Sequence, residues 1–216
     1  MADLIFYTHP MSRGQTIRWM LEEVGQPYET EILDYATTMK QEPYLSINPM
    51  GKVPAIKHNG RVVTECAAIC AYLAAAFPDS GLGPRDEEQA DYYRWLFYAA
   101  GPMEAALTNR AVGWEVPADK ERMFGYGTTD RVIAVLDELF RLHDYVCGDR
   151  FTAADVYVGS QIMFPMQFGM LPELDSFVRY RDRLTEREAY KRGNEIDDQT
   201  GAQMGLAPPQ PHATVE

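Results

Sequence analysis

Residues 78–84 form a short segment of proline, glycine, serine and aspartate that separates two parts of the chain with different hydrophobic patterns. Such a composition is typical of a domain boundary. Before this segment, short apolar runs alternate with stretches in which apolar residues recur at helical spacing. After it, helical spacing continues almost throughout. We therefore expect an α/β domain over residues 1–78 and an all-α helical domain over residues 85–205.

The first domain is expected to run strand, helix, strand, an irregular or helical segment over 39–47, then two strands and a helix. The last two strands flank Asn59 and Gly60, and Asn-Gly between short strands is a strong hairpin signal. Gly25 is expected to end the first helix. The strands are expected at 4–7, 28–33, 53–57 and 61–64, and the helices at 13–24 and 65–77.

The second domain is expected to contain only helices. Thr152 and Asp155 have the Thr-x-x-Asp spacing of a capping box before an apolar helix, so we interpret Asp155 as structural rather than as a catalytic acid. Residues 206–216 include three prolines and few apolar residues, which predicts a poorly ordered tail. The helices are expected at 87–107, 132–142, 153–164 and 174–191.

The charge balance argues against two classes of partner. The sequence has 20 Lys and Arg against 32 Asp and Glu, a net charge of −12, which repels phosphate backbones and predicts no nucleic-acid partner. The longest uncharged apolar run, residues 66–77, is shorter than the ~18–20 residues of a membrane span, so we expect no membrane partner. The first residues carry no basic segment followed by an apolar stretch, which favours a cytoplasmic location.

The cysteines and histidines predict no metal and no disulfide framework. Three cysteines are too few for such a framework, and no further Cys or His stands near Cys66 and Cys70 to complete a zinc site. The four histidines show no ligand spacing. We therefore expect no metal and no bound cofactor.

The turn between the first strand and the first helix, residues 7–13, is the first candidate site. A helix N-terminus presents unpaired N–H groups and partial positive charge, which favour an anion. Ser12 adds a hydroxyl donor to this turn. The alternative is that Ser12 only caps its helix, a common role for serine.

Two further candidates follow in residues 48–54 and 64–69. We expect a cis Val53–Pro54 bond, which would turn the N–H and C=O groups of Val53 outward, where they can pair with an extended ligand; the alternative is an ordinary trans proline at a strand start. Glu65 and the amides of the next helix turn can hold a small zwitterion, with its ammonium on the carboxylate and its carboxylate on the amides. The alternative is that an acidic residue is simply favoured there.

In combination and order, these segments resemble the cytosolic glutathione S-transferases. The similarity is carried by Tyr7-x-x-Pro10-x-Ser12-Arg13 with residues 18–25, by residues 48–54, and by residues 65–73. In the helical part, residues 95–102 resemble the first long helix of the family and residues 151–155 its buried capping motif. The similarity covers nearly all of residues 4–192.

The resemblance implies a thioredoxin-like domain followed by an all-helical domain, a homodimer, and glutathione as co-substrate. Ser12 or Tyr7 would contact the glutathione sulfur, with Arg13 as a second electrostatic contributor. We favour Ser12 because Pro10-x-Ser12 stands where serine- or cysteine-type members place their residue. Glutathione binding is expected at Lys52, Val53, Pro54, Glu65 and Cys66, and an electrophile pocket at Tyr93, Phe97, Met103 and Leu107, with Phe164 and Phe168 as weaker candidates.

The expected activity is conjugation of the glutathione thiolate to hydrophobic electrophiles. Glutathione-dependent disulfide reduction or peroxidase chemistry is a second possibility, and non-catalytic transport of glutathione or a hydrophobic ligand is a third. The sequence departs from the family at Cys66, where serine is commoner. A thiol is a weaker hydrogen-bonding partner than a hydroxyl, so this change either weakens glutathione binding or offers a thiol for a mixed disulfide; the alternative is an inert packed cysteine.

Overall fold

The computed structural model describes residues 3–206, which divide into two compact units. The first unit contains residues 3–83 together with 186–206, and the second contains residues 84–185. Most of the tail expected to be poorly ordered, residues 207–216, lies outside the described residues. The predicted fold class, a thioredoxin-like α/β part followed by a mostly helical part, is confirmed.

The first unit is built on a four-stranded sheet with the strand order β2-β1-β3-β4. Strand β1 pairs in parallel with β2 and antiparallel with β3, which in turn pairs antiparallel with β4. The predicted hairpin is present: Asn59 and Gly60 both have positive φ, the conformation that Asn-Gly turns favour. The strands are β1 (Leu4–Thr8), β2 (Glu29–Ile32), β3 (Ala55–His58) and β4 (Arg61–Thr64).

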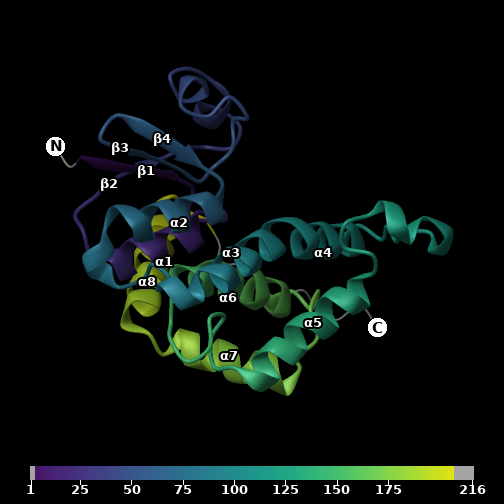
Figure 1. Cartoon of the computed structure of the whole chain (residues 1–216). Coiled ribbons are helices and arrows are strands. Elements are labelled where there is room, and N and C mark those ends of the chain that lie inside the picture. Colours follow the sequence, from purple (N-terminus) through teal and green to yellow (C-terminus); the bar gives the residue numbers. More distant parts are fainter. Residues whose placement is uncertain (1–2, 207–216) are drawn as a thin grey trace. The chain divides into compact units, whose positions relative to one another are not determined.

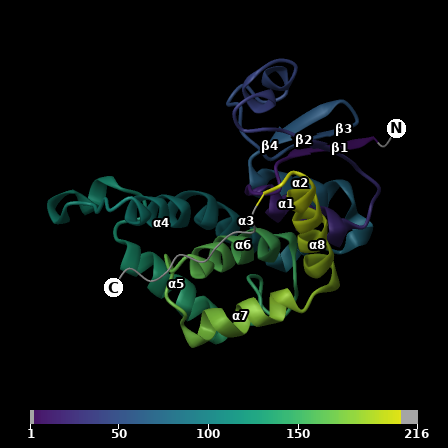
Figure 2. The same cartoon turned by 180° about the vertical axis from the view of Figure 1, so that it is seen from behind.

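Helices cover one face of this sheet, and a long connection covers the other (Figure 1). Helices α1 (Gly14–Val24), α2 (Cys66–Ala76) and α8 (Glu188–Gln203) lie on the first face. Residues 33–54, which contain the short 3₁₀ turns Thr38–Lys40 and Tyr44–Ser46, lie on the opposite face, as Figure 2 shows from behind. The region expected to be irregular or helical is therefore two single turns.

Helix α8 corrects one sequence prediction. A single helix was expected over 174–191, but α7 (Asp175–Thr185) ends and α8 begins three residues later, after an extended Arg187. The Arg187 guanidinium donates two hydrogen bonds to Glu23 of α1, at 2.6 and 2.8 Å. The amphipathic pattern continues across the break, so the pattern alone does not reveal it. The sequence assigns residues 85–205 to the helical domain, whereas residues 186–206 pack in the first unit.

A buried ion pair joins α8 to α1. Arg18 Nε donates to Asp197 at 3.2 Å, and both side chains are almost fully buried. The same guanidinium donates to Tyr28 at 3.0 Å and to Thr30 at 2.8 Å, and it lies over the Phe6 ring. Because a buried charge must be paired, this network fixes α8 against the sheet unit.

The second unit is helical throughout its regular structure. The single helix predicted over 87–107 is instead α3 and α4 with a wide π turn (Ala99–Met103) between them. That turn contains Pro102, which has no N–H to continue the α-helical ladder. The helices are α3 (Gln89–Tyr98), α4 (Glu104–Ala111), α5 (Thr129–Leu142), α6 (Ala153–Gln167) and α7; 3₁₀ turns of this unit lie at Asp86–Glu88 and Ala118–Met123, whereas the turn Pro78–Ser80 belongs to the first unit.

The capping box predicted for α6 is present. Fully buried Asp155 accepts hydrogen bonds from the Thr152 N–H at 2.8 Å, the Val146 N–H at 2.7 Å and the Tyr180 hydroxyl at 2.9 Å. Burial raises the pKa of Asp155 to about 6, against the lowering effect of these donors. The carboxylate is therefore occupied by structural hydrogen bonds.

Within residues 3–206, no helix combines the length and the apolar character needed to cross a membrane.

Candidate functional site

The register of the sheet brings three chain segments to one edge of the first unit. The last complete row across β1, β3 and β4 consists of Tyr7, Ala55 and Thr64. Three segments lie directly beyond this row: the turn 8–13 after β1, the segment 48–54 before β3, and the start of α2 after β4. They therefore lie side by side. The Cys66 Sγ atom lies 3.8 Å from the carbonyl oxygen of Arg13, which directly links two of these segments.

The turn before α1 is held by the hydroxyl of Ser12. Its Oγ donates to the carbonyl of His9 at 2.6 Å and accepts from the Gly14 N–H at 2.9 Å. Gly14 is required here, because a Cβ atom at this position would lie 1.9 Å from the hydroxyl oxygen of Thr8. Ser12 is half-buried and lies at the head of the helix. It closes the turn, and its position also allows it to donate its hydroxyl to a bound anion, so the structure is compatible with both roles considered for it.

Three residues around this turn were missed by sequence reasoning. The buried His9 accepts a hydrogen bond on Nδ1 from the Met11 N–H at 3.1 Å. Tyr35, from the connection after β2, packs its ring 4.4 Å from the imidazole and donates its hydroxyl to the Met11 carbonyl at 3.0 Å. No local signal marks the contacts of Tyr35, because Tyr35 and Met11 are 24 residues apart in sequence.

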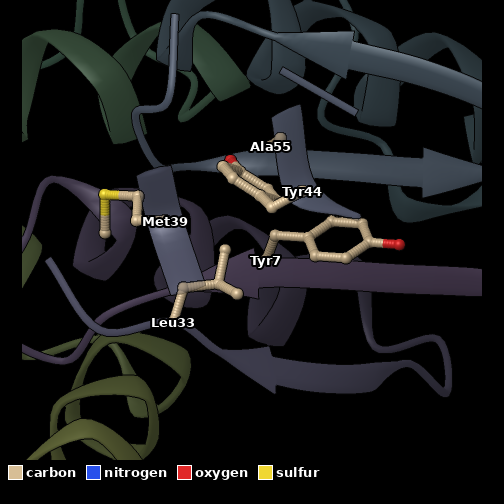
Figure 3. Close-up of a cluster of buried hydrophobic side chains, with 5 residues drawn as sticks. All are labelled: Tyr7, Leu33, Met39, Tyr44 and Ala55. Carbon is tan, nitrogen blue, oxygen red and sulfur yellow. The ribbon is translucent and has the colours of Figure 1, made fainter. Parts of the chain in front are cut away.

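Tyr7 lies in an apolar cluster rather than at the turn. Its ring packs with Leu33, Met39, Tyr44 and Ala55 on the face of the sheet covered by residues 33–54. Figure 3 shows its hydroxyl pointing away from Leu33 and Met39, back along β1 rather than past the end of the strand. Burial, and to a smaller extent Glu31, raises the pKa of Tyr7. The structure therefore does not direct this hydroxyl at the segments that meet.

The Val53–Pro54 bond is cis, as predicted, and so is Glu42–Pro43, which was not predicted. The Lys52 carbonyl accepts from the Tyr44 hydroxyl at 2.6 Å and from Asn48 Nδ2 at 2.8 Å, which fixes the backbone just before Val53. Within residues 3–206, the N–H and C=O groups of Val53 make no hydrogen bond. They form an unused backbone edge beside the turn.

Glu65 precedes α2 with a left-handed backbone, φ 66°. For a residue other than glycine this conformation costs about 1–3 kcal/mol, and such strain is concentrated at functional sites. The side chain of Glu65 is exposed, and the half-buried Cys66 begins the helix directly after it. A carboxylate and the first amides of a helix are thus presented together, as the sequence predicted for a zwitterion site.

Cationic side chains surround the same edge. Arg13 and Lys52 are exposed on two of the three segments. Lys40, which sequence reasoning missed, donates its ammonium to the Gly51 carbonyl in the 48–54 segment. Together these groups can receive an extended peptide that carries carboxylates.

Within residues 3–206, His, Cys, Asp and Glu side chains form no cluster of three or more suited to a metal.

The four residues predicted for an electrophile pocket lie in the second unit and differ in exposure. Tyr93 and Phe97 are exposed on α3, with Phe97 72% exposed. Met103, the last residue of the π turn, and Leu107 of α4 are buried and contribute to the core of the helical unit. A cavity of about 460 Å³ within this unit lies between α4, α5 and residues 169–174, and none of the four lines it.

Comparison with known proteins supports the sequence resemblance. The family model described as "Glutathione S-transferase, N-terminal domain" matches residues 11–76. Glutathione S-transferase 3 of Schizosaccharomyces pombe is 26% identical over 194 residues, 82% of this chain and 74% of that protein. Glutathione S-transferase A of Pleuronectes platessa is 25% identical over 205 residues, covering 84% of this chain and 91% of that protein.

Solved structures match almost the whole chain. The glutathione transferase URE2P6 of Phanerochaete chrysosporium, in complex with oxidized glutathione, has a TM-score of 0.74 and 25% identity over 92% of this chain and 97% of its own. A glutathione transferase homologue from Sulfitobacter, with bound glutathione, has a TM-score of 0.69 and 25% identity over 93% of this chain and 99% of its own. Both matches extend across the two units.

Proposed function

The chain belongs to the glutathione S-transferase family, and from this premise we propose that it binds glutathione at the edge formed by the turn 8–13, Val53–Pro54 and Glu65–Cys66, and conjugates its thiolate to hydrophobic electrophiles. The observation that carries the proposal is the unused backbone edge of Val53 beside the Ser12 turn. An extended peptide paired with Val53 has its central residue next to that turn. In glutathione the central residue is the cysteine.

The other two residues of glutathione match the remaining groups at this edge. Its γ-glutamyl end carries an ammonium and a carboxylate, which suit the Glu65 carboxylate and the first amides of α2 around Cys66. Its glycyl carboxylate suits a lysine, and Lys52 is exposed directly before Val53. Two similar proteins, URE2P6 and the Sulfitobacter homologue, are described with oxidized glutathione and glutathione bound.

Energetics favour a simple activation of the thiol. A free thiol with a pKa of ~8.5 is only about 3% ionised at pH 7. Lowering that pKa by two units requires ~2.7 kcal/mol. One hydrogen bond to a charged acceptor supplies ~1.5–3 kcal/mol, and a helix N-terminus adds ~0.3–1 kcal/mol. A single hydroxyl at the head of α1, with Arg13 nearby, is enough without a general base.

Ser12 is the hydroxyl that we assign to this role. Its proton is directed at the His9 carbonyl in the structure. A hydrogen bond to a charged sulfur is stronger than one to a neutral carbonyl, so the hydroxyl can rotate to the thiolate when glutathione binds. The Gly14 N–H continues to donate to Oγ and makes the hydroxyl a better donor.

The electrophile is proposed to meet exposed side chains of the helical unit, with Tyr93 and Phe97 as candidates because they are accessible. We also propose a homodimer, glutathione as co-substrate with no further cofactor, and a cytoplasmic location. A disulfide reductase, a peroxidase and a carrier are the alternatives.

An activity panel tests the proposal. The chain is assayed with glutathione and an aryl halide, a hydroperoxide or hydroxyethyl disulfide, while calorimetry measures glutathione binding. Turnover with the aryl halide is expected. Activity only with the disulfide or the hydroperoxide identifies the second class, and binding without any turnover identifies a carrier. Absence of glutathione binding overturns the proposed site.

A further inference from the structure

His9 occupies an unusual position for a histidine next to a proposed thiolate site. Continuing the β1–β3 register, in which Tyr7 pairs with Ala55, places His9 opposite Val53. The residue is 4% exposed, so its ring is enclosed by the protein on almost all sides. It therefore lies directly beside the backbone edge that would pair with the cysteinyl residue of glutathione.

The hydrogen bond from the Met11 N–H fixes which ring nitrogen carries the proton. Nδ1 accepts that hydrogen bond at 3.1 Å, so it bears no proton, and the neutral ring must be protonated on Nε2. An imidazolium would set two N–H donors against each other at Nδ1. Burial lowers the pKa of His9 and the Asp34 carboxylate raises it by less, in keeping with a neutral ring.

The Nε2–H group is a donor without an acceptor. Among residues 3–206 it has no hydrogen-bond partner, and it is not one of the enclosed unpartnered polar atoms, so it retains contact with solvent. Tyr35 packs against the ring at 4.4 Å and holds it in place through its own bond to the Met11 carbonyl. A donor that is held in place, keeps only a small contact with solvent and lies next to the proposed thiolate position is suited to receive an anion.

We propose that the Nε2–H of His9 donates a hydrogen bond to the glutathione thiolate, which makes His9 a second catalytic residue beside Ser12; this rests on the proposed glutathione site. The thiol proton goes to solvent, because neutral His9 offers no free basic nitrogen: Nδ1 already accepts from Met11. The imidazole stabilises the anion without changing its own charge. Asp34 and Tyr35 are the titratable groups that face it.

Two substitutions separate this role from a purely structural one. In His9→Asn, the amide oxygen can replace Nδ1 as acceptor of the Met11 N–H, but no donor remains at the Nε2 position. In His9→Gln, the amide nitrogen can replace the Nε2 donor, but the Nδ1 contact is lost. If His9 acts as a catalytic donor, His9→Gln should keep its function and His9→Asn should lose it. If His9 only shapes the turn, His9→Asn should keep the structure of the turn and His9→Gln should lose it.

The measurement is ultraviolet titration of bound glutathione thiolate, together with kcat for the aryl halide and calorimetric glutathione affinity. For His9→Asn we expect the pKa of the bound thiol to rise by about one unit and kcat at pH 6.5 to fall about tenfold, with unchanged glutathione affinity after correction for ionisation. His9→Gln should retain most of both. The reverse order, or equal losses in the two variants, overturns the proposal.

A measurement on the unsubstituted protein keeps the test independent of folding. In ¹⁵N-histidine NMR, the His9 Nε2–H signal should move downfield when glutathione is added. It should not do so with S-methylglutathione, whose thioether cannot ionise. Identical spectra with both ligands contradict the thiolate contact. If glutathione does not bind the unsubstituted protein at all, the proposed function fails rather than the role of His9.

Discussion

Ser12 and Tyr7 show how two hydroxyls five residues apart receive different surroundings. Ser12 lies in a turn with a donor and an acceptor already directed at its oxygen. Tyr7 lies one row inside the sheet, where its ring fills an apolar cluster and its hydroxyl points back along the strand. Only Ser12 can reach a sulfur bound at the end of β1 without repacking the core.

Ser12→Ala is expected to raise the pKa of bound glutathione thiol by one to two units, because it removes a hydrogen bond worth ~1.5–3 kcal/mol to a charged acceptor. Ultraviolet absorbance of the thiolate measures this shift. Tyr7→Phe is the matched control and should leave the pKa unchanged. If Ser12→Ala has no effect on the pKa or on turnover while Tyr7→Phe raises the pKa, the role belongs to Tyr7.

Glu65 combines a functional carboxylate with a strained backbone. Glu65→Ala and Glu65→Gly both remove the carboxylate, so both should weaken glutathione binding by a similar factor of about tenfold or more. Only glycine relieves the left-handed φ of 66°, so Glu65→Gly should be about 1 kcal/mol more stable than Glu65→Ala. Urea denaturation and calorimetry check both values. Equal stability of the two variants contradicts the strain argument.

At the level of elements, α8 depends on close approach to α1. A Cβ atom at Gly193 would lie 3.3 Å from the backbone of Trp19, whereas one at Gly201 in the same helix would meet no atom within 4 Å. We expect Gly193→Ala to destabilise the protein by about 1–3 kcal/mol through overpacking. Gly201→Ala should stabilise it by about 0.5–1 kcal/mol through helix propensity. Denaturant midpoints measure both, and similar values would contradict the close packing.

The start of α6 gives a second prediction at this level, on pH. The folded-state pKa of Asp155, about 6, lies above the ordinary aspartate value of 3.8. Its contribution to stability is therefore fully present below pH ~4 and is lost as pH rises through about 6. Relative to Asp155→Asn, which does not titrate, the unsubstituted protein should gain on the order of 2–3 kcal/mol between pH 7 and pH 4. Parallel stability curves for the two proteins would contradict this.

At the level of the whole molecule, the proposal of a homodimer is open to direct measurement. Sedimentation equilibrium at micromolar concentration should give twice the chain mass of 24.5 kDa. Each chain carries a net charge of −12, so electrostatic repulsion between chains opposes association. The measurement should therefore be made at physiological salt, where this repulsion is screened within ~8 Å. A mass of a single chain under these conditions would contradict the dimer.

The features that the sequence determined by itself depend on residues close together in the chain. The Asn59-Gly60 hairpin and the Thr152–Asp155 capping box each follow from local backbone preferences or from hydrogen bonds that span a few residues. The change from alternating strands and helices to helices alone likewise needs no distant partner. These local rules were enough to predict the fold class and to single out the three segments that the structure brings together at one edge of the sheet.

Tertiary structure decided everything that needs a partner far away in sequence. Helix α8 returns to α1 because Asp197 pairs with an arginine 179 residues earlier, and no hydrophobic period records that contact. The direction of the Tyr7 hydroxyl depends on which residues cover the sheet. The position of the His9 ring depends on Tyr35, which packs against it from a distant segment of the chain. Sequence spacing constrains the backbone locally, whereas the direction and environment of a side chain depend on distant segments that pack around it.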